Sequence, residues 1–268
     1  MSFLCKECIL VPYGCLMSNK LRNAKYLLQA IFADILPQDP GDLDETKYVF
    51  IHIPKTAGTS FMMMLYEHIP AGKIYPNPKE YFINNKGNYP SLQQLLNRKQ
   101  SADILRKRKW LAGHFKYQSA CALVPNAFLI TFLRDPFDRV VSEIVHIKTN
   151  HKIHRARSIE AIITKRLKIM GTMQALTFGY LPRKDNLKQA IDNLGTCQFI
   201  GLTEKMTESI DRLNTVLGTS FRLGKAVNVG ELSLKEEVIH TYGDRIRENL
   251  SVDAKFYEYG VRLIEELA

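Results

Sequence analysis

Short apolar runs alternate with longer stretches of helical periodicity along most of this chain. Two runs, 48–53 and 128–133, are rich in β-branched and aromatic residues and predict buried strands. Shorter runs at 110–114 and 197–202 predict two more strands. Helical patterns lie at about 61–67, 91–108, 136–148, 158–195 with breaks at Gly171 and Pro182, 207–217 and the end of the chain. Strands that alternate with helices form mostly parallel sheets with helices on both faces, so the predicted fold class is α/β.

The first 42 residues differ in pattern from the rest. Residues 1–18 are irregular, 19–36 place apolar residues on one stripe of a helix, and 37–42 are typical of a linker. We therefore predict an N-terminal irregular segment and helix over 1–42 and one large domain over 43–268. Within that domain, prolines and glycines interleaved with aromatic residues over 70–90 predict a long loop region that shapes a site.

Composition narrows the function classes. Lys and Arg outnumber Asp and Glu by 37 to 27, which gives a net charge of +10 and suits an anionic cofactor, substrate or surface. Hydrophobic residues make up 46% of the chain, which excludes a disordered protein. Nucleic acid is not an expected partner, because the sequence has no helix-turn-helix, zinc-finger or RNP pattern. No run of 18 apolar residues occurs, so we expect no transmembrane segment.

The N-terminal residues bear on the compartment and on metal binding. Their apolar segments are too short for a signal peptide, so we expect a cytoplasmic protein if the chain is full length. Cys5 and Cys8 form a C-x-x-C pair near Cys15, but no second pair or clear fourth ligand follows. We favour reduced thiols there and expect no metal site. The other cysteines are Cys121 and Cys197, and the odd total of five argues against a disulfide scaffold.

The segment after the first strand has the composition of an anion-binding loop. The apolar run ends at Pro54, a basic and hydroxyl-rich stretch follows, and a helical pattern begins near Phe61. A helix start offers unpaired N–H groups and the positive end of a dipole, which favour a phosphate-like group. An ordinary strand–turn–helix with a lysine at the turn is the alternative. The predicted cofactor-binding residues here are Lys55, Thr56, Ala57, Gly58, Thr59 and Ser60.

A second anion-binding segment follows the strand at 128–133. Arg134 stands at the strand end, Asp135 can cap a helix that begins at Pro136, and Ser142 follows Arg134 by eight positions. An arginine offers a planar fork to a phosphate, and the serine hydroxyl adds a donor. A helix cap with a local Arg134–Asp135 pair is the alternative. Both segments follow strands, and ligands of parallel α/β sheets bind at the carboxyl ends of the strands.

These segments resemble the cofactor motifs of sulfotransferases. The sequence Ile53-Pro-Lys-Thr-Ala-Gly-Thr-Ser60 is similar to the 5′-phosphosulfate loop of the carbohydrate (Golgi-type, 2-O-sulfotransferase-like) branch, and it is not a Walker A loop, because its lysine precedes the glycine. Arg134 and Ser142 match the spacing of the family's 3′-phosphate motif. Weaker similarities lie at 197–204, to which we assign an architectural role only, and at 251–258. The resemblance implies a P-loop-like sheet fold and 3′-phosphoadenosine 5′-phosphosulfate (PAPS) as co-substrate. It also implies the Golgi lumen as the compartment if an N-terminal anchor was removed.

The resemblance also implies the chemistry, which is transfer of a sulfuryl group from PAPS to an acceptor hydroxyl, with a carbohydrate favoured. Lys55 would stabilise the leaving phosphate oxygen, and a base would take the hydroxyl proton. His114 is the candidate base, because related 2-O-sulfotransferases carry their catalytic histidine in a corresponding segment. A histidine bonded to backbone at a strand end is the alternative, and Glu80 and Glu143 are other candidate bases. We interpret His52 as a core histidine with its hydrogen bonds satisfied.

Other interpretations stay open. The basic stretch 146–168 suits a groove for an anionic glycan, or else a solvated helix or lid. A P-loop-like kinase is an alternative function, although the sequence lacks a Walker A lysine and a convincing Mg²⁺ carboxylate. A non-catalytic module that binds anionic glycans is another. The sequence indicates neither the acceptor nor the oligomeric state.

Overall fold

The structure is a computed structural model that describes residues 46–85, 88–90, 95–97, 101–150, 158–179, 185–224 and 232–266. The predicted helix at 19–36, the boundary at residue 42, Cys5, Cys8 and Cys15 lie outside the described residues. The same holds for residues 151–157 of the basic stretch and for the predicted helix break at Pro182.

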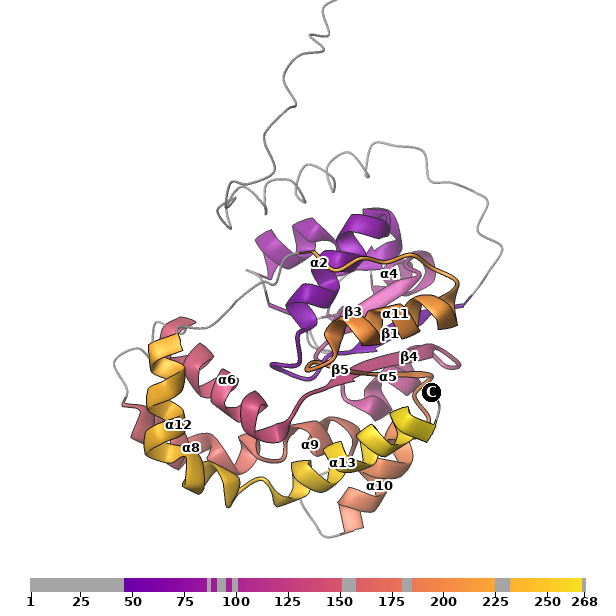
Figure 1. Cartoon of the computed structure of the whole chain (residues 1–268). Coiled ribbons are helices and arrows are strands. Elements are labelled where there is room, and N and C mark those ends of the chain that lie inside the picture. The colour runs from indigo at the N-terminus through magenta and orange to yellow at the C-terminus, as the bar shows by residue number, and fades with distance from the viewer. Residues whose placement is uncertain are drawn as a thin grey trace, which may run out of the picture.

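A five-stranded parallel sheet forms the centre of the protein (Figure 1). Its strands are β1 (Tyr48–Ile51), β2 (Ile74–Tyr75), β3 (Trp110–Gly113), β4 (Phe128–Leu133) and β5 (Phe199–Leu202), in the order β2-β3-β1-β4-β5. Every pairing is parallel, which confirms the predicted sheet. The register sets Ile51 beside Gly113 of β3 and beside Thr131 of β4, so these three strands end at one edge.

Strand β2 lies in the region that the sequence predicted to be loop. Ile74 and Tyr75 pair with Trp110 and Leu111, and both are fully buried. Two residues are too few to show the alternation by which a strand is recognised in a sequence. The short 3₁₀ helix η1 (Ala71–Lys73) and the π-helical turn η2 (Glu80–Asn84) lie on either side of this strand.

Helices cover both faces of the sheet, as predicted, and one further group lies to its side (Figure 1). They are α2 (Gly58–His68), α4 (Ser101–Lys107), α5 (Tyr117–Leu123), α6 (Pro136–Asn150), α8 (Ile159–Met170), α9 (Met173–Phe178), α10 (Asp185–Leu194), α11 (Met206–Leu217), α12 (Leu232–Arg247) and α13 (Ser251–Glu266). The predicted break at Gly171 is confirmed, since α8 ends just before it. Helix α5 was not predicted from the sequence, and one closing helix was predicted where the chain has α12 and α13.

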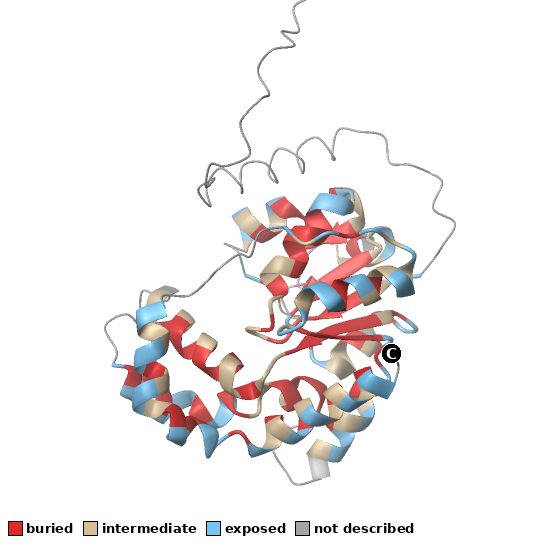
Figure 2. Ribbon diagram, in the orientation of Figure 1, coloured by how far each residue is buried: buried red, intermediate tan, exposed pale blue. Residues whose placement is uncertain are grey.

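Alternation along the strands divides the interior into layers, and Figure 2 shows the buried sheet between partly exposed helices. Phe50 and Phe132 face α2 and α11, whereas Val49 and Leu133 face the layer that contains α5, α9, α10 and α13. A third apolar cluster joins α6, α8 and α12. Helix α6 therefore starts at the sheet edge and packs away from the sheet, which leaves the carboxyl ends of β1, β3 and β4 beside its first turns (Figure 1).

Candidate functional site

The loop between β1 and α2 has an unusual backbone. Lys55 and Ala57 both have left-handed φ angles, of 72° and 59°. That conformation costs a non-glycine residue roughly 1–2 kcal/mol, and it is found preferentially at functional sites. Left-handed residues within a turn direct nearby N–H groups toward one concave side, where an anion can bind. The start of α2 at Gly58 adds the N–H groups of a helix N-terminus.

The hydroxyl groups of this loop are not all available to a ligand. Thr56 is fully buried, and its hydroxyl donates to the Ile53 carbonyl over 2.9 Å. This differs from the expectation that the Thr56 hydroxyl faces a ligand, because the turn folds the side chain back onto its own backbone. Thr59 and Ser60 are half-buried in the first turn of α2, and the Thr59 hydroxyl bonds to that of Tyr81.

Strand β4 brings Arg134 to the same loop. Its Nη1 atom donates to the Lys55 carbonyl over 3.1 Å, although the two residues are 79 positions apart. The Asp135 side chain accepts from the backbone N–H of Asp138 over 3.0 Å, so it caps α6 as predicted. Arg134 is thus directed at the loop and not at its neighbour Asp135, which disfavours the simple Arg–Asp pair. Ser142 is half-buried on α6.

His114 follows β3 at the same edge of the sheet. Its Nδ1 atom lies 3.0 Å from the His52 carbonyl, which can only accept, so Nδ1 carries a proton. In the neutral ring the lone pair is then on Nε2. The side chain reaches the surface, yet the surrounding protein still lowers the pKa of His114 through desolvation, and only its hydrogen bond to His52 and the charge of Glu143 oppose this. His114 is therefore neutral at pH 7 and holds a lone pair at Nε2.

His52 is not the satisfied core histidine that the sequence suggested. It is only 6% exposed, and its Nδ1 atom has no hydrogen-bond partner among the described residues. Its ring stacks on His114 at 4.7 Å between centroids and lies 4.1 Å from the ring of Tyr89. Burial, followed by electrostatic interaction with His114 and Lys55, holds the pKa of His52 well below its usual value. His52 is thus a neutral ring that supports His114.

The two acidic candidates for the base are engaged elsewhere. The Glu143 carboxylate lies 2.7 Å from Nη1 of Arg139 and is largely buried. Glu80 accepts from the backbone N–H of Asn77 over 2.7 Å. Each carboxylate stabilises local structure through these contacts, so we favour His114, whose Nε2 lone pair has no such role.

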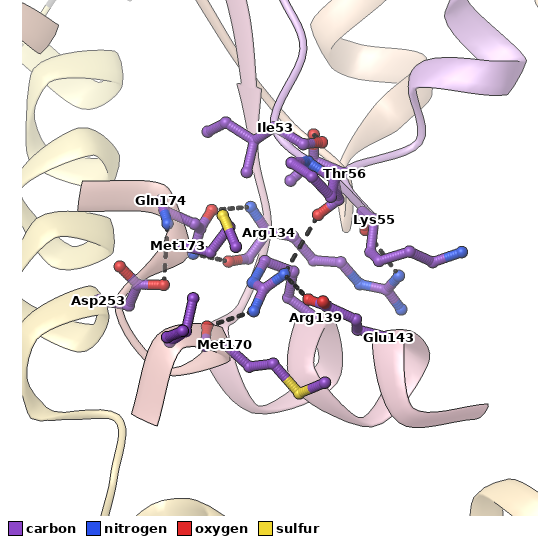
Figure 3. A network of polar contacts seen from close by, with 12 residues as sticks. Ile53, Lys55, Thr56, Arg134, Arg139, Glu143, Met170, Met173, Gln174 and Asp253 are labelled. Carbon is purple, nitrogen blue, oxygen red and sulfur yellow. Dashed lines mark hydrogen bonds and ion pairs between the residues drawn. The ribbon is translucent and has the colours of Figure 1, made fainter. Parts of the chain in front are cut away.

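The lysine of the loop is electrostatically perturbed. Burial lowers the pKa of Lys55 from 10.5 to about 8, and Arg134 and Arg139 act in the same direction while Glu143 opposes them. Two guanidinium groups beside a half-buried ammonium make an unfavourable arrangement that a bound anion would relieve. Figure 3 shows the Lys55 and Arg134 side chains extending toward the same side. A strongly perturbed cation beside a second cation, at the ends of parallel strands, is typical of a functional site.

Comparison with known proteins identifies the family. The sequence model of the sulfotransferase family matches residues 43–192. The chain belongs to the sulfotransferase family. A search of curated proteins finds no match.

Two solved structures are similar to this sulfotransferase. A sulfotransferase from Alicyclobacillus acidocaldarius aligns with a TM-score of 0.43 at 14% identity, over 80% of this chain and 97% of that one. The mouse sulfotransferase SULT7A1, crystallised with PAP, aligns with a TM-score of 0.43 at 15% identity, over 87% of this chain and 72% of that one.

A buried polar network behind the loop was missed in the sequence (Figure 3). Arg139 is fully buried and donates to Pro54, Glu143 and Met170. Gln174 accepts from the Arg134 N–H over 3.0 Å and donates to the Arg134 carbonyl over 2.8 Å, so it fixes the end of β4. The spacing of Arg139 and Glu143 by four positions on one helix was the signal that could have revealed the ion pair.

The motif at 197–204 has the architectural role that we assigned to it. A Cβ atom on Gly201 would lie 2.3 Å from the Phe132 ring, so β5 can approach β4 only with glycine there. The Thr203 hydroxyl donates to the Leu133 carbonyl over 3.0 Å, and Glu204 accepts from the Asp135 N–H over 2.7 Å. These contacts hold the segment that carries Arg134 in this sulfotransferase.

The described part of the chain contains neither a membrane-spanning helix nor a cluster of metal ligands. None of its helices is long and apolar enough to cross a membrane. Within the same residues, no three His, Cys, Asp or Glu side chains are grouped so that they could hold a metal ion.

Proposed function

We propose that this sulfotransferase moves a sulfuryl group from PAPS to a hydroxyl group of an acceptor. The observation that carries the proposal is the meeting of Lys55, Arg134 and His114 at the ends of three adjacent strands, with Arg134 bonded to the loop that holds Lys55. PAPS carries anionic groups on both sides of its ribose. The loop 55–60 suits the 5′-phosphosulfate, and Arg134 with Ser142 suits the 3′-phosphate.

The residues divide the reaction between them. The acceptor oxygen attacks sulfur in line while its proton passes to Nε2 of His114, which the His52 carbonyl orients through Nδ1. The bond between sulfur and the bridging phosphate oxygen breaks, and 3′-phosphoadenosine 5′-phosphate (PAP) leaves with the electron pair. The Lys55 ammonium stabilises the charge that develops on that oxygen. No metal ion is needed in this scheme.

A carbohydrate is the acceptor that we favour. The support is the resemblance of Ile53-Pro-Lys-Thr-Ala-Gly-Thr-Ser60 to the loop of the 2-O-sulfotransferase-like branch. An anionic glycan would suit the exposed cations Lys165, Arg166 and Lys168 on α8. Turnover measured with glycans that differ in charge tests the choice of acceptor independently of nucleotide binding.

Calorimetric titration with PAP, with AMP as the control, tests the core of the proposal. Tight binding that depends on the 3′-phosphate is expected, since it requires both anion-binding segments. A folded protein that does not bind PAP would exclude the sulfotransferase reaction. Turnover that is lost in EDTA would instead favour a kinase, and binding without turnover in a broad acceptor screen would favour a glycan-binding module.

Replacement of Lys55 by alanine tests the chemistry. The Lys55→Ala variant should lose most turnover, because Lys55 no longer binds the phosphosulfate or stabilises the leaving oxygen. Near-normal turnover with PAPS would contradict the assigned role.

A further inference from the structure

Arg139 is a fully buried charge in the second layer of the site. Its Nη1 atom donates to the Pro54 carbonyl over 3.3 Å and to Glu143 over 2.7 Å, and its Nη2 atom donates to the Met170 carbonyl. One side chain thus joins the loop after β1, the helix α6 and the end of α8 (Figure 3). A buried ion pair contributes little net stability compared with apolar residues of similar volume, so stability alone does not account for it.

The contact with Pro54 fixes the backbone of the loop. Arg139 holds the carbonyl of Pro54, and Arg134 holds the carbonyl of the next residue, Lys55. The two arginines therefore fix the peptide planes on both sides of the Lys55 Cα atom, which has the left-handed φ of 72°. In a trans peptide the C=O and N–H groups point in opposite directions. A Pro54 carbonyl held toward Arg139 therefore turns the Lys55 N–H away from it, out of the buried network.

Arg134 and Arg139, which both belong to the segment after β4, thereby organise the loop after β1. We propose that Arg139 is a positioning residue that holds the Pro54–Lys55 peptide in the orientation that receives the 5′-phosphate end of the nucleotide. This inference rests on the proposed function for the identity of the ligand. The position of Arg139 also affects Lys55 electrostatically, since its charge contributes to the lowered pKa of that lysine.

The test is a set of variants titrated with nucleotides that carry one phosphate or two. The double variant Arg139→Met, Glu143→Leu removes the pair without leaving one charge buried alone. Arg139→Lys keeps a cation but loses the fork that reaches both Pro54 and Met170. Arg245→Met is the matched control, because Arg245 makes an exposed ion pair with Glu160 at 2.6 Å on other helices. The ligands are PAP, adenosine 5′-phosphate and adenosine 3′-phosphate, with thermal unfolding measured for each variant.

A positioning role predicts a selective loss. In the double variant, affinity for PAP and adenosine 5′-phosphate should fall by about 10- to 100-fold, as for the loss of a hydrogen bond made by a charged group. Affinity for adenosine 3′-phosphate should stay within about twofold, since Arg134 and Ser142 remain. Arg139→Lys should show a smaller loss with the same selectivity, and Arg245→Met should bind all three ligands like the native protein.

Other results overturn the inference. Equal loss of both monophosphates would mean that Arg139 only supports the fold, and unchanged affinity for all ligands would mean that the loop holds its shape without it. If the double variant does not fold, Arg139→Lys decides between the same outcomes. Failure of the native protein to bind PAP would remove the proposed function and this inference together, whereas binding by the native protein with an unselective loss removes the inference alone.

Discussion

The affinity of this protein for PAP should fall as the pH rises above about 8, because Lys55 then loses its proton. Burial and the neighbouring Arg134 lower the pKa of Lys55 to about 8 in the free protein, against 10.5 for an ordinary lysine. A bound phosphate favours the ammonium form, so the pKa of Lys55 is higher in the complex than in the free protein. PAP therefore binds more tightly at pH 7 than at pH 9, because Lys55 of the free protein loses its proton over this range.

The size of the effect follows from that pKa. With a pKa of about 8, the protonated fraction of Lys55 falls from about nine tenths at pH 7 to about one tenth at pH 9. The dissociation constant should accordingly rise about tenfold over this range, which is about 1.4 kcal/mol of binding free energy. The phosphate groups of PAP have their second pKa near 6 and do not change charge appreciably in this interval.

Calorimetry can measure both the affinity and the proton uptake. Titration at pH 8 in buffers with different ionisation heats should show uptake of about half a proton per PAP bound, because Lys55 is half protonated in the free protein at its pKa of about 8. Lys55→Met is the control and should bind weakly with no such uptake. An affinity independent of pH between 7 and 9 in the native protein would refute the reasoning, as would the same uptake in the variant.

Three further predictions concern neighbouring residues. His114→Ala should lower turnover by about 10²- to 10⁴-fold and leave the dissociation constant of PAP unchanged, which steady-state kinetics and titration would separate. Gly58→Ala should lower the free energy of unfolding by about 1–3 kcal/mol and weaken PAP binding, because the added Cβ would lie 2.0 Å from Nε2 of His52. Gly195→Ala is the control and should be tolerated, because its Cβ would meet its nearest atom at 3.4 Å. Asp253→Asn should lower the free energy of unfolding by about 1–3 kcal/mol, since the Asp253 carboxylate accepts two N–H groups at the start of α9. Because burial raises the pKa of Asp253 from 3.8 to about 6, the native protein should lose stability as pH rises from 4 to 6, and this loss should be absent from that variant in unfolding measured across the range.

The sheet and the approximate position of the site could be predicted because both depend on local patterns. Apolar runs of four to six residues marked β1, β3, β4 and β5, and their parallel order placed Lys55 and Arg134 at one edge. Strand β2 was not predicted, because two buried residues between turns show no periodicity. The cap by Asp135 was also visible, since a cap depends on the residues next to it.

The polar contacts of the site could not be predicted, because they join segments far apart in the chain. His52 lies beside His114, 62 positions away, through a contact that neither segment encodes alone. Arg139 is buried only by the packing of α6 against the loop and α8. The sequence by itself determined four of the five strands, which loops carry cations, and that strand ends would bring them near each other. The tertiary structure decided which donor meets which carbonyl, and therefore the charge state of Lys55 and the tautomer of His114, because burial and long-range contacts set both.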